Sequence, residues 1–291
     1  RRSKMMDRRN FLRNAAVTLS AASAFAGKGL AAISALRARP LGAQLYTVRD
    51  QAERDLPGTL AAIRAIGYQE VETYWNVYSH PAAELKRMIA DHGLLAPSGH
   101  FDYDGLEAKL DYATELGLHW VICPMLPQNL WGSLDGFQRA AEQFNKWGER
   151  INGMGMRFGF HNHDYEFRPF GNTSGFEVLM SQTDPQLMCL EMDCYWMTQA
   201  GQDPVAMLKK LGPRIELLHL KDRKPGFPIS YDLNQAAEHF TPVGTGTIDW
   251  KAILSLARTS GVKNLFVEQD SGDLPAIESL KISYRNLQPL L

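Results

Sequence analysis

The stretch Arg157-Phe-Gly-Phe-His-Asn-His-Asp-Tyr-Glu-Phe167 passes from an apolar run into a polar one. Its first half is typical of a short buried strand. Side chains alternate between the two faces of a strand, so His161 and His163 are predicted to point the same way. Two imidazoles on one face, followed by Asp164 and Glu166, fit a metal site, acid–base chemistry or a hydrogen-bonded turn.

Strand-like runs alternate with helical patterns on both sides of this stretch. The predicted strands are Leu41–Tyr46, Glu70–Tyr74, Leu95–His100, Trp120–Met125, Arg157–His161, Met188–Asp193, Glu216–Leu220 and Asn264–Glu268. The predicted helices are Thr59–Ile66, Ala82–His92, Leu106–Leu116, Leu134–Met154, Phe176–Gln182, Pro204–Leu211, Trp250–Thr259 and Pro275–Asn286. Strict alternation of strand and helix predicts parallel strands with helices outside, and eight such units predict a closed (β/α)₈ TIM barrel. No glycine-rich fingerprint follows the first strand, which weakens the dinucleotide-binding alternative.

The composition is that of an ordinary globular protein. The chain has 291 residues, a formal net charge of -1 and 45% apolar residues. No basic field is available to neutralise a phosphate backbone, which argues against nucleic acid as the main partner.

The N-terminal residues are typical of an export signal. Asp7-Arg8-Arg9-Asn10-Phe11-Leu12-Arg13 precedes a mild apolar run from Ala15 to Ala26. This run is too short for a stable membrane span, and the paired arginines before Phe-Leu resemble a twin-arginine signal. We therefore expect a signal peptide and short leader at 1–38, a single catalytic barrel at 39–291 and a periplasmic location. The alternative is an amphipathic N-terminal helix.

Polar side chains gather at the predicted strand ends, where TIM barrels carry their catalytic groups. They are Gln44, Tyr46, Glu72, Tyr74, His100, His161, His163, Asp193, His219, Lys221, Glu268 and Asp270. Asp193, His219 and Glu268 end three successive strands, and His161 ends the strand before them. Mixed imidazole and carboxylate ligands suit Mn²⁺, Zn²⁺, Co²⁺ or Fe²⁺ better than Ca²⁺. The sequence thus predicts one divalent metal ion, the alternative being isolated polar residues satisfied by their neighbours.

Further residues near these strand ends have two interpretations each. Glu191 shares a strand face with Asp193 but lies one layer deeper, where a carboxylate needs a partner that the sequence does not name. Lys221 is positioned beside His219, either to stabilise negative charge at a carbonyl or as part of a solvated loop. Four aromatic residues form either a wall for a sugar ring or plain core: Tyr46, Trp75, Trp131 and Trp196. The long segment Gly226–Thr247 is predicted to be a mobile cover over the site.

Five motifs in this order resemble the sugar phosphate isomerase/epimerase family, whose barrels are similar to xylose isomerase. They are Gly42-Ala-Gln-Leu-Tyr-Thr-Val-Arg-Asp50, Gly159-Phe-His-Asn-His-Asp-Tyr-Glu-Phe167, Asp193-Cys-Tyr-Trp196, Leu218-His-Leu-Lys-Asp222 and Val267-Glu-Gln-Asp270. The resemblance runs from about Leu41 to the C-terminus. It implies one divalent metal held by His161, Asp193, His219 and Glu268, and substrate contacts from Glu72, His100, His163 and Lys221.

One departure from the family concerns the fifth strand. Sugar epimerases of this type generally end it with a glutamate, which shuttles protons together with a glutamate on strand eight. His161 stands there instead, which supports a metal site and puts the two-glutamate mechanism in doubt. Related branches with a histidine-rich fifth strand include dehydratases and enzymes that act on keto-sugars.

The leading functional hypothesis is a metal-dependent isomerase or epimerase that acts through an enediolate on an unphosphorylated sugar or sugar derivative. His163 or Glu268 would remove the proton, while Lys221 and His100 would steer the substrate oxygens. Further substrate contacts are expected from Gln44, Tyr46, Glu72 and Trp196. The main alternative is a lyase, hydratase or hydrolase that acts on a keto-sugar or keto-glycoside with the same metal site. A non-catalytic periplasmic sugar-binding barrel is a weaker alternative, and the charge argues against a metal nuclease.

Overall fold

The computed structural model describes residues 40–235 and 238–291, so the predicted export signal lies outside the described residues. Within this part of the chain, parallel strands close into a barrel in the order β1-β12-β9-β8-β5-β4-β3-β2. The barrel strands are β1 (Gly42–Gln44), β2 (Glu70–Thr73), β3 (Leu95–His100), β4 (Trp120–Cys123), β5 (Arg157–His161), β8 (Met188–Asp193), β9 (Ile215–Leu220) and β12 (Asn264–Val267). The TIM-barrel prediction is confirmed.

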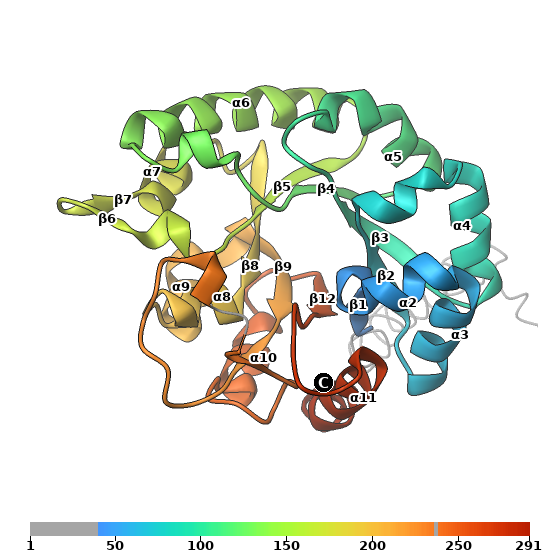
Figure 1. Ribbon diagram of the computed structural model, residues 1–291. Coiled ribbons are helices and arrows are strands. Elements are labelled where there is room, and N and C mark those ends of the chain that lie inside the picture. The colour runs from blue at the N-terminus through green and yellow to red at the C-terminus, as the bar shows by residue number, and fades with distance from the viewer. Residues whose placement is uncertain (1–39, 236–237) are drawn as a thin grey trace, which may run out of the picture. The chain divides into compact units, whose positions relative to one another are not determined.

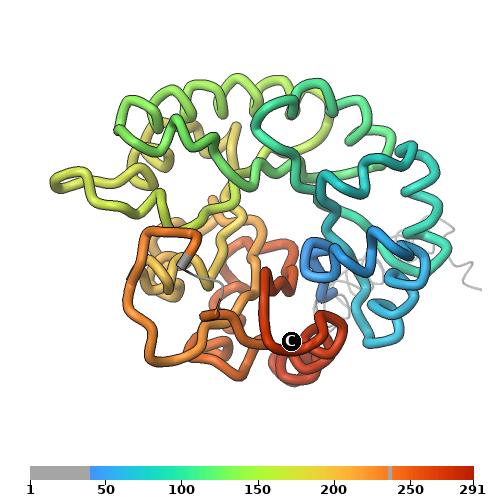
Figure 2. Tube along the Cα trace, in the orientation of Figure 1, coloured from blue at the N-terminus to red at the C-terminus, as the bar shows by residue number. Residues whose placement is uncertain are grey.

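Helices surround the barrel on its outer side (Figure 1). They are α2 (Arg49–Arg54), α3 (Leu56–Ile66), α4 (Ala82–Asp91), α5 (Leu110–Leu116), α6 (Leu134–Gly153), α7 (Gly175–Gln182), α8 (Cys194–Gln199), α9 (Pro204–Leu211), α10 (Trp250–Ala257) and α11 (Ala276–Leu287). The tube in Figure 2 follows the chain around the barrel from its blue start to its red end. The ring closes where β12 pairs with β1, with Gly42 opposite Phe266.

Local sequence explains where the helices begin and end. The longest described helix, α6, begins after Ser133, whose side chain accepts a hydrogen bond from the backbone N–H of Gly136. Helix α5 ends at Gly117, which has a φ of 90° in the left-handed region that favours glycine. None of the helices in residues 40–235 and 238–291 is both long and apolar enough to cross a membrane.

One layer of the barrel interior, beneath the C-terminal strand ends, is apolar and closely packed. Ile122, Cys189, Leu217 and Phe266 form a buried cluster contributed by four strands. Gly159 of β5 lies against this cluster, because a Cβ atom added there would come within 2.6 Å of the Cδ1 atom of Ile122. The strand ends above this layer carry the polar side chains, so the packed layer acts as the floor of the candidate site.

The structure corrects several predicted boundaries. Strand β1 stops at Gln44, because Leu45–Val48 turns into a short 3₁₀ helix that carries Tyr46. Strand β5 has the predicted bounds and ends at His161, so His163 lies in the loop that follows. Elements that the sequence did not predict include helices α2 and α8 and two small antiparallel sheets, β6 (Pro169–Phe170) with β7 (Thr173–Ser174) and β10 (Asp222–Arg223) with β11 (Phe240–Thr241).

Candidate metal centre

Four buried side chains meet at the C-terminal end of the barrel. His161, Asp193 and His219 lie in β5, β8 and β9, and Glu268 directly follows β12. One ligand atom from each lies within 4.8 Å of the others, so together they could hold a metal ion. Nδ1 of His219 is 2.8 Å from Oε2 of Glu268, and Nε2 of His161 is 3.7 Å from Oδ2 of Asp193. We call these four residues the upper group; they are the ligands that the sequence resemblance implied.

The carboxylate of Asp193 fits a metal ligand. Its Oδ1 atom accepts a 2.8 Å hydrogen bond from the backbone N–H of Trp196 and so caps α8. Its Oδ2 atom is buried and has no hydrogen-bond partner within the described part of the chain, although Nζ of Lys221 lies 3.2 Å away. A buried carboxylate oxygen of this kind calls for a cation.

The charges around Lys221 also favour a metal ion at this site. Its ammonium lies 3.2 Å from Asp193, 2.6 Å from Glu268 and 3.0 Å from Asp270. When all these groups are ionised, three carboxylates face one ammonium, which leaves an excess of negative charge that a divalent cation would balance. Burial alone would raise the pKa of Glu268, but Lys221 and His219 outweigh it and hold that pKa below its usual range.

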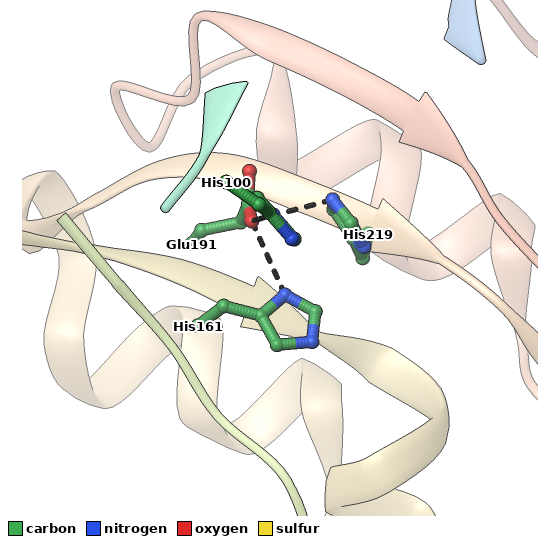
Figure 3. A group of neighbouring side chains, drawn as sticks. All are labelled: His100, His161, Glu191 and His219. Atoms are coloured by element: carbon green, nitrogen blue, oxygen red, sulfur yellow. Dashed lines mark hydrogen bonds and ion pairs between the residues drawn. The ribbon is translucent and has the colours of Figure 1, made fainter. Parts of the chain in front are cut away.

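Two further carboxylates lie beneath the upper group. Glu72 Oε2 is 2.6 Å from Nε2 of His219 and 3.1 Å from Nε2 of His100. Glu191 Oε2 is 2.7 Å from Nε2 of His100, 3.1 Å from Nδ1 of His161 and 3.2 Å from Nε2 of His219. Figure 3 shows the carboxylate of Glu191 among these three rings. The partners that the sequence could not name for Glu191 are therefore imidazoles from three different strands.

A cavity of about 560 Å³ opens above these layers. Its polar lining includes His100, His163, Lys221 and Glu268. Its aromatic lining is Tyr46, Trp75, Trp196 and Phe240. The cavity thus joins part of the upper group to an aromatic wall of the kind that packs against sugar rings.

The two cavity imidazoles have different electrostatic surroundings. Burial lowers the pKa of His163, and the ammonium of Lys221 lowers it further, so this ring is neutral at neutral pH. Burial acts the same way on His100, but the carboxylates of Glu72 and Glu191 outweigh it and raise its pKa to about 9. A neutral imidazole can accept a proton and a protonated one can donate it, so the cavity contains one ring of each kind.

Other residues predicted as substrate contacts divide into two sets. Tyr46 and Trp196 line the cavity, as expected for an aromatic wall. Gln44 and Glu72 are fully buried beneath it, and Nε2 of Gln44 donates a 2.7 Å hydrogen bond to Glu72. Trp131, also considered for the wall, stacks on Tyr165 with a ring separation of 3.9 Å and does not line the cavity.

The long segment Gly226–Thr247 contributes Leu233, Asn234 and Phe240 to the cavity. Its glycine-rich end is held by Asp222, whose Oδ2 atom accepts hydrogen bonds from the backbone N–H groups of Gly244 and Gly246. Described residues of the predicted cover therefore line the cavity, and its mobility stays a prediction.

Known proteins show the same architecture. Residues 60–285 match the family model described as a xylose isomerase-like TIM barrel. An inosose dehydratase of Clostridium botulinum (strain Alaska E43 / Type E3) is 32% identical over 123 residues, which are 40% of this chain and 41% of that protein. Similar inosose dehydratases from other bacteria are matched over 41% to 63% of their length, less than two thirds in each case.

Solved structures agree on the fold. A sugar phosphate isomerase/epimerase from Parabacteroides distasonis ATCC 8503 superimposes with a TM-score of 0.74 and 24% identity, covering 89% of this chain and 99% of that one. The IOLI protein, solved with a zinc atom, superimposes with a TM-score of 0.68 and 14% identity over 86% of this chain and 97% of that one. The chain belongs to the xylose isomerase-like TIM-barrel family.

Proposed function

We propose that this chain is a metal-dependent dehydratase that acts on an unphosphorylated keto-sugar or keto-polyol. The observation that carries the proposal is the placement of two imidazoles, His100 and His163, in one cavity beside the upper group. The ring of His161 is close to both, with its centroid 5.3 Å from that of His100 and 5.0 Å from that of His163. A proton can therefore be taken from one part of a bound substrate and delivered to another.

The upper group would hold the ion through His161, Asp193, His219 and Glu268, where a divalent cation supplies Lewis-acid polarisation of a substrate carbonyl. His163 removes the proton from the carbon next to that carbonyl, and the Lys221 ammonium stabilises the negative charge that develops as the enediolate forms.

His100 then gives a proton to the hydroxyl group on the β-carbon. The C–O bond breaks, a double bond remains between the two carbons, and water leaves. No oxidant or reductant takes part. Nε2 of His100 is held between Glu72 and Glu191, which keeps a proton on the ring and fixes its orientation toward the cavity.

Two features support dehydration over epimerisation. An epimerase of the two-glutamate type needs a carboxylate at the end of β5, where this chain has His161 in the upper group. In addition, several curated relatives matched over part of the chain are named inosose dehydratase, and a dehydratase removes water.

The cavity lining supports an unphosphorylated substrate. Lys221 is the one lysine or arginine that lines it within the described part of the chain, and it already pairs with three carboxylates. A phosphate group would meet uncompensated negative charge there.

Isomerisation or epimerisation is the second candidate, because it proceeds through the same enediolate. Nζ of Lys221 lies 2.6 Å from Oε2 of Glu268, and both line the cavity, so this pair could return the proton to a different carbon. The exported, periplasmic location is likewise proposed, from the twin-arginine-like residues at the N-terminus.

The test is an assay of the purified full chain, loaded with Zn²⁺ or Mn²⁺, against inososes, 3-keto-sugars and free aldoses in D₂O. Mass spectrometry and NMR should detect a product that has lost one water, together with deuterium at the carbon next to the carbonyl in recovered substrate. An isomer without loss of water would favour the second candidate. Wild-type protein that binds no metal and exchanges no proton would contradict both.

A further inference from the structure

The two histidines of the upper group each use both ring nitrogens. His161 directs Nε2 toward Asp193, at 3.7 Å, while its Nδ1 lies 3.1 Å from Glu191. His219 directs Nδ1 toward Glu268, at 2.8 Å, while its Nε2 lies 2.6 Å from Glu72. The two rings therefore face the other members of the upper group through different nitrogens. Each turns its second nitrogen to a carboxylate below.

We propose that Glu191 and Glu72 are positioning residues that fix the tautomers of His161 and His219. This inference rests on the metal centre of the proposed function. A neutral imidazole carries its proton on one nitrogen and a lone pair on the other. A carboxylate accepts the proton-bearing N–H, so Glu191 places the proton of His161 on Nδ1 and Glu72 places that of His219 on Nε2. Both lone pairs then face the upper group.

The surroundings of Glu72 show that it is fixed as an acceptor. Its Oε1 atom accepts a 2.5 Å hydrogen bond from the hydroxyl of Ser98, and its Oε2 atom accepts a 2.7 Å bond from Gln44. Glu72 and Glu191 are both fully buried. Gln44 therefore has a role beneath the cavity, as a group that orients the carboxylate below His219.

The same geometry has a competing interpretation. His100, His161, Glu191 and His219 also place ligand atoms within 4.8 Å of one another and could hold an ion themselves (Figure 3). We call these four residues the lower group. An ion there would use Nδ1 of His161 and Nε2 of His219, which would leave N–H groups facing Asp193 and Glu268.

The two groups therefore require opposite tautomers of the shared rings. The cavity lining does not decide between them, because Glu268 of the upper group and His100 of the lower group both border it. Charge favours the upper group, because Asp193 and Glu268 share the single ammonium of Lys221 with Asp270 and so leave negative charge for a divalent cation to balance.

Zinc titration of the full chain by calorimetry, with competing chelator, measures the affinity. Replacing an outer carboxylate of this kind lowers metal affinity by about ten- to a hundredfold. Glu191→Gln and Glu72→Gln should each lower zinc affinity to that extent, with the stoichiometry unchanged at about one ion per chain. Glu70→Gln is the matched control, because Glu70 is a buried carboxylate of the same strand as Glu72 that accepts from Asn264 instead of an imidazole.

A direct readout is the tautomer itself. Long-range ¹H–¹⁵N spectra of the zinc-loaded protein, assigned with His161→Gln and His219→Gln, should show zinc on Nε2 of His161 and on Nδ1 of His219. The opposite assignment would place the ion in the lower group and overturn the inference. Unchanged zinc affinity in both folded glutamine variants would overturn it as well.

The outcomes separate this inference from the proposed function. Wild-type protein that binds no zinc contradicts the metal centre, and the inference fails with it. If wild type binds zinc and the Glu191→Gln and Glu72→Gln variants bind it equally tightly, the metal centre stands and only the positioning role is contradicted.

Discussion

The Nζ atom of Lys221 lies 2.6 Å from Oε2 of Glu268, inside the group of side chains that would hold the metal. Burial would lower the pKa of Lys221, but the carboxylates of Asp193, Asp270 and Glu268 outweigh it and hold that pKa well above its usual range. The ammonium of Lys221 therefore stays charged and competes with a bound metal ion for the same carboxylates.

The first prediction follows from this competition. Lys221→Met should tighten zinc binding by about tenfold or more, since like charges at such distances repel by several kcal/mol at an effective dielectric constant of about 20. Added zinc should also raise the melting temperature more than in wild type, because the apo variant leaves three carboxylates uncompensated. Turnover should fall, because the charge that stabilises the enediolate is gone. Calorimetry measures zinc affinity, thermal melting measures the shift in melting temperature, and an activity assay measures turnover.

Lys263→Met is the control for this change, because Lys263 pairs with Glu216 outside the upper group. Its zinc affinity should match that of wild type. A smaller rise in melting temperature on adding zinc to Lys221→Met than to wild type would contradict the competition.

The second prediction concerns Asp193, which both caps α8 and belongs to the upper group. Asparagine keeps the cap, because its side-chain oxygen can still accept from Trp196, but removes the ligand charge. Asp193→Asn should therefore lower zinc affinity more than about a hundredfold, which exceeds the loss expected when Glu72 or Glu191 is replaced. The melting temperature of the metal-free protein should stay close to that of wild type. Asp249→Asn makes the same change at the cap of α10, where Asp249 accepts from Ala252, and should leave zinc affinity unchanged.

The third prediction tests the packing beneath the site. Gly159→Ala should lower the free energy of unfolding by about 1–3 kcal/mol, because the new Cβ atom overpacks the barrel interior. The contact is with Cδ1 of Ile122, at 2.6 Å. Ile122→Val removes that atom, so the double variant should recover part of the loss in urea denaturation. Gly132→Ala, where an added Cβ meets no atom within 4 Å, is the neutral control. Strictly additive effects of Gly159→Ala and Ile122→Val would argue against this contact.

The fourth prediction is a pH dependence at the opposite end of the barrel. Burial would raise the pKa of Glu216, but hydrogen bonds from Lys263 and Trp120, with the charge of Arg157, outweigh it and lower that pKa. A depressed carboxyl pKa stabilises the folded state above the unfolded-state value, and this stabilisation is lost as the pH falls through the folded-state value.

Glu216→Gln should accordingly lower the free energy of unfolding near neutral pH by about 1–3 kcal/mol. The difference from wild type should shrink as the pH falls below the ordinary glutamate value near 4.5. Urea denaturation between about pH 3 and 7 measures this. Glu278→Gln, at a half-exposed pair with Lys281, should change little at any pH. A difference that stays constant across the range would contradict the assignment.

Sequence patterns predicted the barrel because strand and helix periodicities repeat through the whole chain. They also predicted His161, Asp193, His219 and Glu268 as metal ligands, since polar residues at the ends of apolar strands stand out along the sequence; the fold brings these four side chains together. The end of the first strand at Gln44 was not predicted, because tertiary packing decides where an extended run turns into a 3₁₀ helix.

The hydrogen-bond partners within the site could not be read from the sequence. Glu191 meets His100 and His219, which are 91 and 28 positions away along the chain, and only barrel closure and register bring these groups together. The partners of Asp222 could not be predicted either, because its hydrogen bonds with Gly244 and Gly246 depend on the path of a long loop. Sequence alternation predicted which face these residues share, but not which atoms they touch.

The carboxylate of Asp193 connects the aromatic wall to the upper group. One oxygen receives the backbone N–H of Trp196, a residue of the aromatic wall, and the other belongs to the upper group. Anything that fixes one oxygen restricts the other. Cation binding and packing of a ligand against the wall would therefore change each other's affinity, and the size of that change is a coupling free energy. That coupling is reciprocal, which means that a sugar stacked on Trp196 would hold the ion more tightly by the same factor as the ion holds the sugar.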